Sequence, residues 1–233
     1  MDSKLIVVAI GGNSLITDKK NVTVKSQYET ARESIKPIVQ LIKDGHRVVI
    51  THGNGPQVGF ILRRAEYAKS ILHTVPLDSC VADTQGSIGY QLQMAICNEL
   101  AKLGVKRQVG TVITQVEVDP ADPAFEKPSK PIGSFMSKEE AEKQAKKEGW
   151  HIMEDANRGY RRVVPSPKPN KIVETQSIKT LLDAGIVTVA VGGGGIPVVR
   201  DKNNDLIGCE AVIDKDLATC LLAKQLNADM FIV

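Results

Sequence analysis

The sequence predicts an α/β fold built on a mostly parallel sheet, and two observations carry this prediction. Apolar runs rich in β-branched residues alternate with segments of helical periodicity, in the order strand, helix, strand, helix from the start of the chain. Three of these runs end in glycine-rich turns, at residues 11–12, 53–55 and 192–195. In a parallel sheet such turns lie together along the carboxyl edge, which is where open α/β sheets bind ligands.

The first predicted strand is the apolar run LIVVAI at residues 5–10. An unbroken apolar run is typical of a strand that is buried on both faces of the sheet. It leads into Gly11, Gly12 and Asn13, where the glycines let a ligand approach the backbone and N–H groups are left for an anion. A glycine pair after a strand also fits a simple tight turn, so the ligand hypothesis depends on the recurrence of this design.

The remaining elements are predicted from the same two periodicities. Helices are predicted at residues 26–43, 58–68, 78–102, 137–148, 172–183 and 216–226, and strands at residues 46–51, 105–118, 186–191, 206–208 and 230–233. Within the strand at 105–118, the clearest part runs from Thr111 to Thr114. Gly86 and Gly89, inside the long helix, are best explained by close packing of that helix.

Between residues 119 and 169 the amino-acid composition of the sequence changes. Prolines bracket a helix rich in lysine and glutamate, and the segment is too long for a structureless loop in a compact domain. The sequence therefore predicts three parts: residues 1–118, an inserted lid-like subdomain at 119–169, and residues 170–233.

Composition and cysteine spacing limit the possible classes of function. The net charge of +3 is too small to suggest a nucleic-acid-binding protein, and 42% hydrophobic residues is ordinary for a folded chain. The cysteines, Cys80, Cys97, Cys209 and Cys220, lack C-x-x-C spacing and lie among apolar neighbours, so we expect buried free thiols in a reducing cytosol and no zinc site. No apolar run approaches the roughly 18 residues that span a bilayer, and we expect a cytoplasmic protein.

A lysine between two acids, Asp214-Lys215-Asp216, opens the last predicted helix. The helix dipole alone favours acids at that position, but it does not explain the lysine among them. A full positive charge beside turns that present backbone amides suits phosphate oxygens. His52 we interpret as a structural neighbour of its glycine turn rather than as a catalytic base.

Two common phosphate-binding motifs are absent. No G-x-x-x-x-G-K-[ST] occurs, which excludes a P-loop enzyme. The glycines at 192–195 precede Pro197 and the β-like Val198 and Val199 rather than a helix, which argues against a dinucleotide site.

Six motifs, in order, match a known family. They are VVAIGGN, THGNGPQVG, PxKPIG, EDxxRGYRRVVPSP, VGGGGIPV and AVIDKDLA. From residue 5 to residue 233 the chain closely resembles the carbamate kinases of the amino acid kinase family. The resemblance implies an open αβα sandwich on a mostly parallel sheet with an inserted protruding subdomain, a homodimer, and a role in arginine metabolism.

The resemblance also implies a reaction: reversible phosphoryl transfer between ATP and carbamate, giving ADP and carbamoyl phosphate. Mg²⁺ would arrive bound to ATP, with no other metal, and neither nucleic acid nor membrane would take part. The residues implied to hold carbamate and the transferring phosphoryl group are Gly11, Gly12, Asn13, Gly53 and Asn54. Those implied to bind the nucleotide are Gly193, Gly194, Gly195 and Asp214.

Three further residues are implied to act in catalysis. Lys130 would swing in from the insertion, Lys215 would balance charge on the phosphoryl group, and Asp216 would orient the lysine. Residues 1–118 would then carry the acyl-phosphate site and residues 170–233 the start of the nucleotide-binding part. The carbamate oxygen is already anionic, so no general base is required.

Members of this family continue past the strand at 230–233, in a part that supplies much of the adenine pocket. We therefore expect the chain to lack its carboxyl-terminal portion. Three interpretations stay open: an active carbamate kinase whose sequence is incomplete here, a truncated fragment that binds anions without turnover, or another acylphosphate-forming kinase of the same family.

Overall fold

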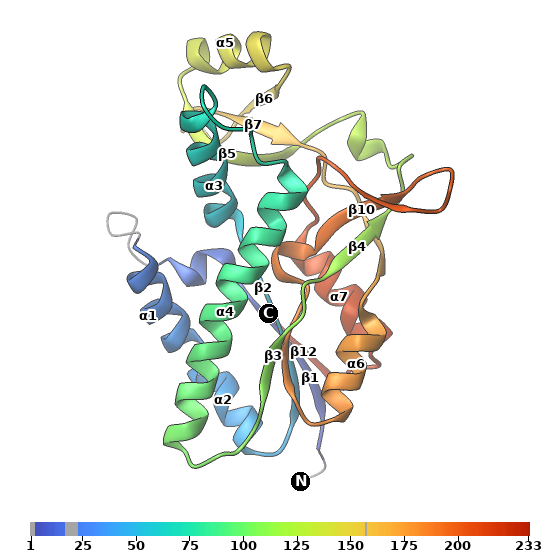
Figure 1. Cartoon of the computed structure of the whole chain (residues 1–233). Coiled ribbons are helices and arrows are strands. Elements are labelled where there is room, and N and C mark those ends of the chain that lie inside the picture. The colour runs from blue at the N-terminus through green and yellow to red at the C-terminus, as the bar shows by residue number, and fades with distance from the viewer. Residues whose placement is uncertain (1–2, 17–22, 157) are drawn as a thin grey trace.

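The computed structural model describes residues 3–16, 23–156 and 158–233 (Figure 1). In these ranges the main sheet has the strand order β12-β1-β2-β9-β3, and each neighbouring pair is parallel. Its strands are β1 (Leu5–Ile10), β2 (Arg47–His52), β3 (Val109–Thr111), β9 (Val187–Val189) and β12 (Met230–Ile232). The predicted mostly parallel sheet is confirmed, and β1, β2 and β9 are the strands that lead into the three glycine turns.

Helices cover both faces of this sheet. On one side lie α1 (Val24–Ser34), α2 (Lys36–Lys43) and α4 (Leu77–Lys102), and on the other α6 (Thr175–Asp183) and α7 (Lys215–Gln225). Strand β1 is buried along its whole length because alternate side chains enter the two cores. Ile6 and Val8 pack with the first group of helices, and Leu5 and Val7 with the second. The open αβα sandwich is confirmed.

The prediction of a single helix at residues 26–43 is wrong. Two helices, α1 and α2, meet at Ile35, and Pro37 lies in the first turn of α2. Proline has no backbone N–H and fits the beginning of a helix better than its interior, which explains the break. The same property explains why α3 (Gly55–Ala68) begins three residues earlier than predicted, since Pro56 occupies its first turn.

The strand predicted at residues 105–118 is also divided. Strand β3 ends at Thr111, and β4 (Gln115–Val118) belongs to a second sheet of order β11-β10-β4-β8. Its other strands are β8 (Pro169–Ile172), β10 (Ile196–Arg200) and β11 (Leu206–Gly208). The residues expected as the clearest part of one strand, Thr111–Thr114, instead connect the two sheets, and there the N–H of Thr114 donates to the side chain of Gln85. The helix predicted at residues 172–183 begins later, as α6 at Thr175, because Ile172 pairs with Val116 in the second sheet.

The segment inserted between β4 and β8 of the second sheet forms a separate layer. It contains η2 (Pro123–Phe125), β5 (Lys130–Met136), α5 (Lys138–Glu148), β6 (His151–Glu154) and β7 (Tyr160–Val164). The strands make an antiparallel sheet of order β5-β7-β6, which projects beyond α3 with α5 outermost (Figure 1). Ile132 and Val164 of this layer share a buried cluster with Val58 of α3. The domain limits at residues 118 and 169 stay a prediction.

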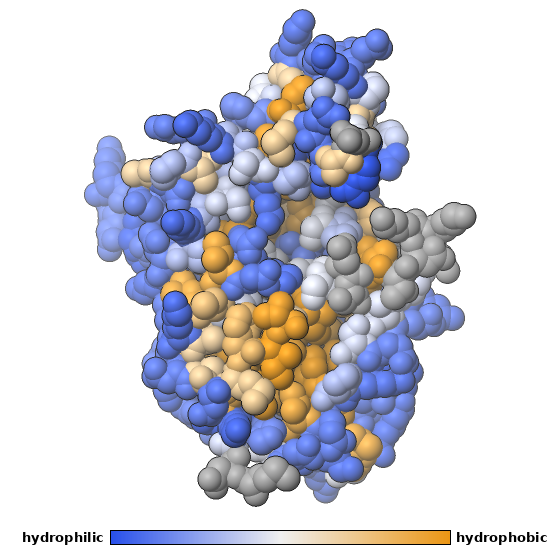
Figure 2. All heavy atoms as spheres, turned by 180° about the vertical axis from the view of Figure 1, so that it is seen from behind, coloured by the Kyte–Doolittle hydropathy of each residue, from blue (hydrophilic) through white to orange (hydrophobic). Residues whose placement is uncertain are grey.

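The back of the molecule carries a continuous apolar area on its lower half (Figure 2). Exposed apolar side chains near the end of the chain are Met230, Phe231 and Val233, and β12 is an edge strand of the main sheet. Large apolar areas of this kind are typical of surfaces that contact other polypeptide. None of the helices in the described ranges combines the length and apolar character needed to cross a bilayer.

The two glycines of α4 provide a matched pair of substitutions. A β-carbon at Gly89 would overlap the Thr111 side chain of β3, whereas one at exposed Gly86 would meet nothing within 4 Å. We predict that Gly89→Ala lowers the free energy of unfolding by about 1–3 kcal/mol through overpacking. Gly86→Ala should raise it by about 0.5–1 kcal/mol, because alanine favours helix. Urea denaturation of both variants checks this, and shifts of the same sign would contradict it.

Candidate active site

The three glycine turns meet at the carboxyl edge of the main sheet. A β-carbon on Gly53 would lie 2.5 Å from the backbone nitrogen of Gly12. Similarly, one on Gly192 would overlap the imidazole of His52, and one on Gly193 would overlap the amide of Asn54. Glycine is therefore required at these positions by close packing of one turn on the next. The predicted convergence of the turns is confirmed.

A cavity of about 290 Å³ opens at this junction. Its walls come from the turns after β1, β2 and β9, from β5 of the projecting layer, and from the segment that begins α7. The predicted site residues that line it are Gly12, Gly53, Asn54, Lys130, Gly193, Asp214, Lys215 and Asp216. Sites at this edge of an α/β sheet are where ligands generally bind.

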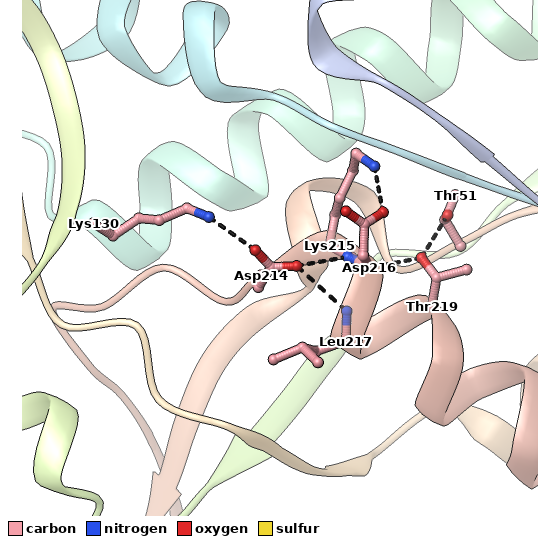
Figure 3. Close-up of polar contacts among 7 residues, drawn as sticks. All are labelled: Thr51, Lys130, Asp214, Lys215, Asp216, Leu217 and Thr219. Carbon is pink, nitrogen blue, oxygen red and sulfur yellow. Dashed lines mark hydrogen bonds and ion pairs between the residues drawn. The ribbon is translucent and has the colours of Figure 1, made fainter. Parts of the chain in front are cut away.

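Asp214 connects the projecting layer to the start of α7 (Figure 3). One carboxylate oxygen accepts from the N–H groups of Asp216 at 2.9 Å and Leu217 at 3.4 Å, which caps the helix. The other accepts from the ammonium of Lys130 at 2.9 Å. Burial by itself would raise the pKa of this carboxyl, but the hydrogen bond and charge of Lys130 and the two N–H groups outweigh it and lower the pKa below its usual value.

Lys215 is the first residue of α7, and its side chain lies over Gly53. Its ammonium donates to Asp216 at 2.5 Å, and its backbone oxygen accepts from the hydroxyl of Thr219 at 2.6 Å. A hydroxyl has one proton, so Thr51 must be the donor in the 2.8 Å bond between Thr51 and Thr219 (Figure 3). This series of hydrogen bonds holds the first turn of α7 against the end of β2, and so fixes the backbone position from which the side chain of Lys215 extends.

The turn after β9 has an unusual backbone. Val191, Gly193, Gly194 and Gly195 all have positive φ, and Val191 is a β-branched residue in the left-handed region. Such a conformation costs of order 1–3 kcal/mol and persists only where the surroundings impose it. Here the N–H of Val191 donates to the hydroxyl of Thr114 at 3.0 Å.

Four predicted site residues are not in the cavity lining. Gly194 and Gly195 are buried against Ile213 and Val116, and Gly11 lies in the backbone before Gly12. The side chain of Asn13 lies outside the part of the chain that the structure describes. The functional roles of all the predicted site residues stay predictions.

Sequence reasoning missed two polar residues of α4 that support the site. The side-chain amide of Asn54 donates to the hydroxyl of Thr84 at 2.8 Å, which turns Asn54 across Gly193. Gln85, the next residue, bonds Thr114 and Gly192. Both lie on the buried stripe of the helix with Val81 and Ile88, so polar residues on an apolar helix face were the available signal.

His52 is 1% exposed and lies against Gly192. One ring nitrogen is 3.0 Å from the carbonyl oxygen of Gly53. Burial lowers the pKa of this imidazole to about 4, and the Gly53 carbonyl opposes this only in part. The side chain is thus neutral and packed at ordinary pH, as expected for a structural neighbour of the turn.

Comparison with known proteins gives a consistent result. The sequence profile of the amino acid kinase family matches residues 4–233. The carbamate kinase-like protein YahI of Escherichia coli is 49% identical over 233 residues, which cover 99% of this chain and 73% of that protein. The carbamate kinase of Clostridium perfringens is 51% identical, with 98% and 73% covered. A Giardia lamblia carbamate kinase bound to AMP-PNP superposes with a TM-score of 0.89 at 42% identity, with 98% of this chain and 72% of that chain covered.

The buried His52 gives a prediction for pH dependence. Its pKa is lower in the folded state than in the unfolded state, so below the unfolded value of 6.5 the unfolded chain gains a proton that the folded chain does not. We predict that stability falls by about 2 kcal/mol from pH 7 to pH 5 because of this group. Urea denaturation of the parent and of His52→Gln at both pH values measures it. Equal pH dependence in the two proteins would contradict the prediction.

Proposed function

The chain belongs to the amino acid kinase family, and we propose that it is a carbamate kinase that transfers a phosphoryl group reversibly between ATP and carbamate. The observation that carries this proposal is the cavity in which three backbone turns meet the side chains of Lys130 and Lys215. Relatives named as carbamate kinases are about half identical to this chain over nearly all of its length, which supports the same reaction. The products in one direction are ADP and carbamoyl phosphate.

The arrangement suits a reaction that needs positioning and neutralisation of charge. An oxygen of carbamate attacks the terminal phosphorus of ATP, and the bond from that phosphorus to the bridging oxygen breaks as ADP leaves. Carbamate is already anionic, so no proton has to be removed, which agrees with a buried His52 that is not placed as a base. The side chain of Lys215 lies over Gly53, and its ammonium would balance charge as the phosphoryl group passes.

We assign the nucleotide phosphates to the turn at Gly193 and the acyl group to the turns at Gly12 and Gly53. A structural relative carries AMP-PNP, an ATP analogue, which supports a nucleotide site on this fold. The same turns also contain Gly11, Asn13, Gly194 and Gly195. We propose that these four residues contribute to the site through the backbone of the turns.

Mg²⁺ is proposed to come with ATP. The lining carboxylates, Asp214 and Asp216, are those that would contact it, and each is paired with a lysine. Among the described residues no group of three or more His, Cys, Asp or Glu forms a metal cage. This donor set fits a Mg²⁺ held largely by phosphate oxygens, where it neutralises phosphate charge.

Three wider features are part of the proposal and rest on the family resemblance: a homodimer, a cytoplasmic location and a role in arginine metabolism. The apolar area in Figure 2 is compatible with association of chains. Sedimentation velocity tests the dimer, and a single species of monomer mass at micromolar concentration would contradict it.

We predict that Lys215→Ala lowers kcat for ATP formation from carbamoyl phosphate and ADP by about 100-fold or more, with a smaller change in KM for ADP. The reason is the loss of a charge that acts on the transferring group. Lys224→Ala, in the last turn of the same helix, is the matched control and should keep parental kinetics. Turnover of Lys215→Ala within a factor of three of the parent would remove this lysine from the mechanism, and an inactive parent would contradict the proposed function itself.

The projecting layer is proposed to act as a lid that brings Lys130 onto the substrate. In the structure Lys130 is held by Asp214, so an incoming phosphoryl group has to compete with that carboxylate. We predict that carbamoyl phosphate with ADP slows hydrogen exchange in β5, since closure excludes water. In Lys130→Met the slowing should be lost. Full protection of β5 in the free protein would contradict the lid.

A further inference from the structure

Gln85 is a buried glutamine that bonds two separate parts of the site. It lies in the middle of α4 with 1% of its surface exposed. Its side-chain nitrogen donates to the carbonyl oxygens of Thr114 at 3.0 Å and Gly192 at 2.9 Å, and its side-chain oxygen accepts from the N–H of Thr114 at 2.7 Å. The side chain does not line the cavity, so its effect on a ligand has to be exerted through the backbone.

The orientation of this amide is fixed by its neighbours. Two carbonyl oxygens face the amide nitrogen, and one N–H faces the amide oxygen. The reverse orientation would bring three oxygens together and leave a buried N–H without an acceptor, which is costly. Gln85 is therefore a donor toward Gly192.

The carbonyl oxygen of Gly192 is held by two donors, the side chain of Gln85 at 2.9 Å and the N–H of Gly195 at 3.0 Å, and its direction sets which way the next peptide group points. The bond between Gly192 and Gly193 is trans, so its C=O and N–H point in opposite directions. With the carbonyl oxygen of Gly192 drawn inward to α4, the N–H of Gly193 is directed away from the helix. Gly193 lines the cavity whereas Gln85 does not, so that N–H is presented to the cavity side.

The conformation of this turn needs such support. Positive φ at Val191 is strained, and the glycines at 193–195 have little intrinsic preference for their left-handed conformation. Thr114 fixes the first residue of the turn through the N–H of Val191, and Gln85 fixes both Thr114 and Gly192. The same section of α4 fixes the neighbouring turn, because Thr84 holds Asn54.

We propose that Gln85 is a positioning residue for the nucleotide phosphates: it holds the carbonyl of Gly192 inward and thereby aims the N–H of Gly193 at a phosphate oxygen. The proposal rests on the proposed function, because the anion concerned is the phosphate chain of ATP or ADP. Backbone N–H groups held in advance in a glycine turn bind phosphate without a cost of reorganisation.

The main test compares Gln85→Met, which keeps the size of the side chain and removes its hydrogen bonds, with Gln91→Met on the same helix as control. We expect Gln85→Met to bind ADP with Mg²⁺ at least 10-fold more weakly by calorimetry, while KM for carbamoyl phosphate stays within about 3-fold. In ¹⁵N-glycine spectra the ADP-induced shift of the Gly193 amide should be lost. A folded Gln85→Met that binds ADP within 2-fold of the parent would overturn the proposal, as would equal loss of affinity for both substrates.

A second variant keeps the proposal falsifiable if Gln85→Met does not fold. Gln85→Glu has no donor when ionised, but its protonated form regains one O–H donor toward the carbonyls. We expect the ADP affinity of this variant, relative to the parent, to rise as pH falls from 8 to 6, and a constant ratio would overturn the proposal. The calorimetric and spectroscopic measurements of ADP binding do not depend on turnover, unlike the KM for carbamoyl phosphate. Lack of ATP formation by a parent that binds ADP would therefore count against the proposed reaction alone.

Discussion

The site depends on one constraint, the close contact of three turns at positions where glycine carries no side chain. Gly12 touches Gly53, His52 touches Gly192, and Asn54 lies across Gly193. The parallel order of β1, β2 and β9 brings the turns to one edge, and the missing β-carbons let the turns pack directly on one another. The cavity, the position of Lys215 over Gly53 and the support from α4 all follow from this packing.

Charge in the cavity is balanced internally before any ligand binds. Lys130 and Lys215 are each hydrogen-bonded to an aspartate, and Asp214 also caps the helix that carries Lys215. The lysines, whose side chains are only partly buried, are therefore held by ion pairs close to where phosphate would lie. Binding of a phosphoryl group exchanges one anionic partner for another, so the cations need little desolvation at that moment.

Much of this arrangement could be predicted from the sequence because it follows from local pattern. The unbroken run at β1 and the glycines after three strands sufficed to predict a parallel sheet and a common edge. The break at Ile35 was missed although Pro37 marked it, because the apolar periodicity continues across it. The passage of the chain from one sheet to the other near Thr114 was missed, and the hydrogen bond found there joins Thr114 to Gln85 on a distant part of the chain. Contacts of that range leave no periodic signal.

The cavity has two kinds of wall. On the side built from glycine turns, Gly53 and Gly193 have no room for an added methyl group, so the wall cannot be altered by a larger residue at either position. The opposite side comes from β5 and the segment before α7, where Pro131, Ile132 and Val212 present ordinary side chains to the same space. A change of acceptor size would therefore have to be engineered from the projecting layer, which makes that layer the part of the molecule where substrate range can evolve while the phosphate machinery stays unchanged.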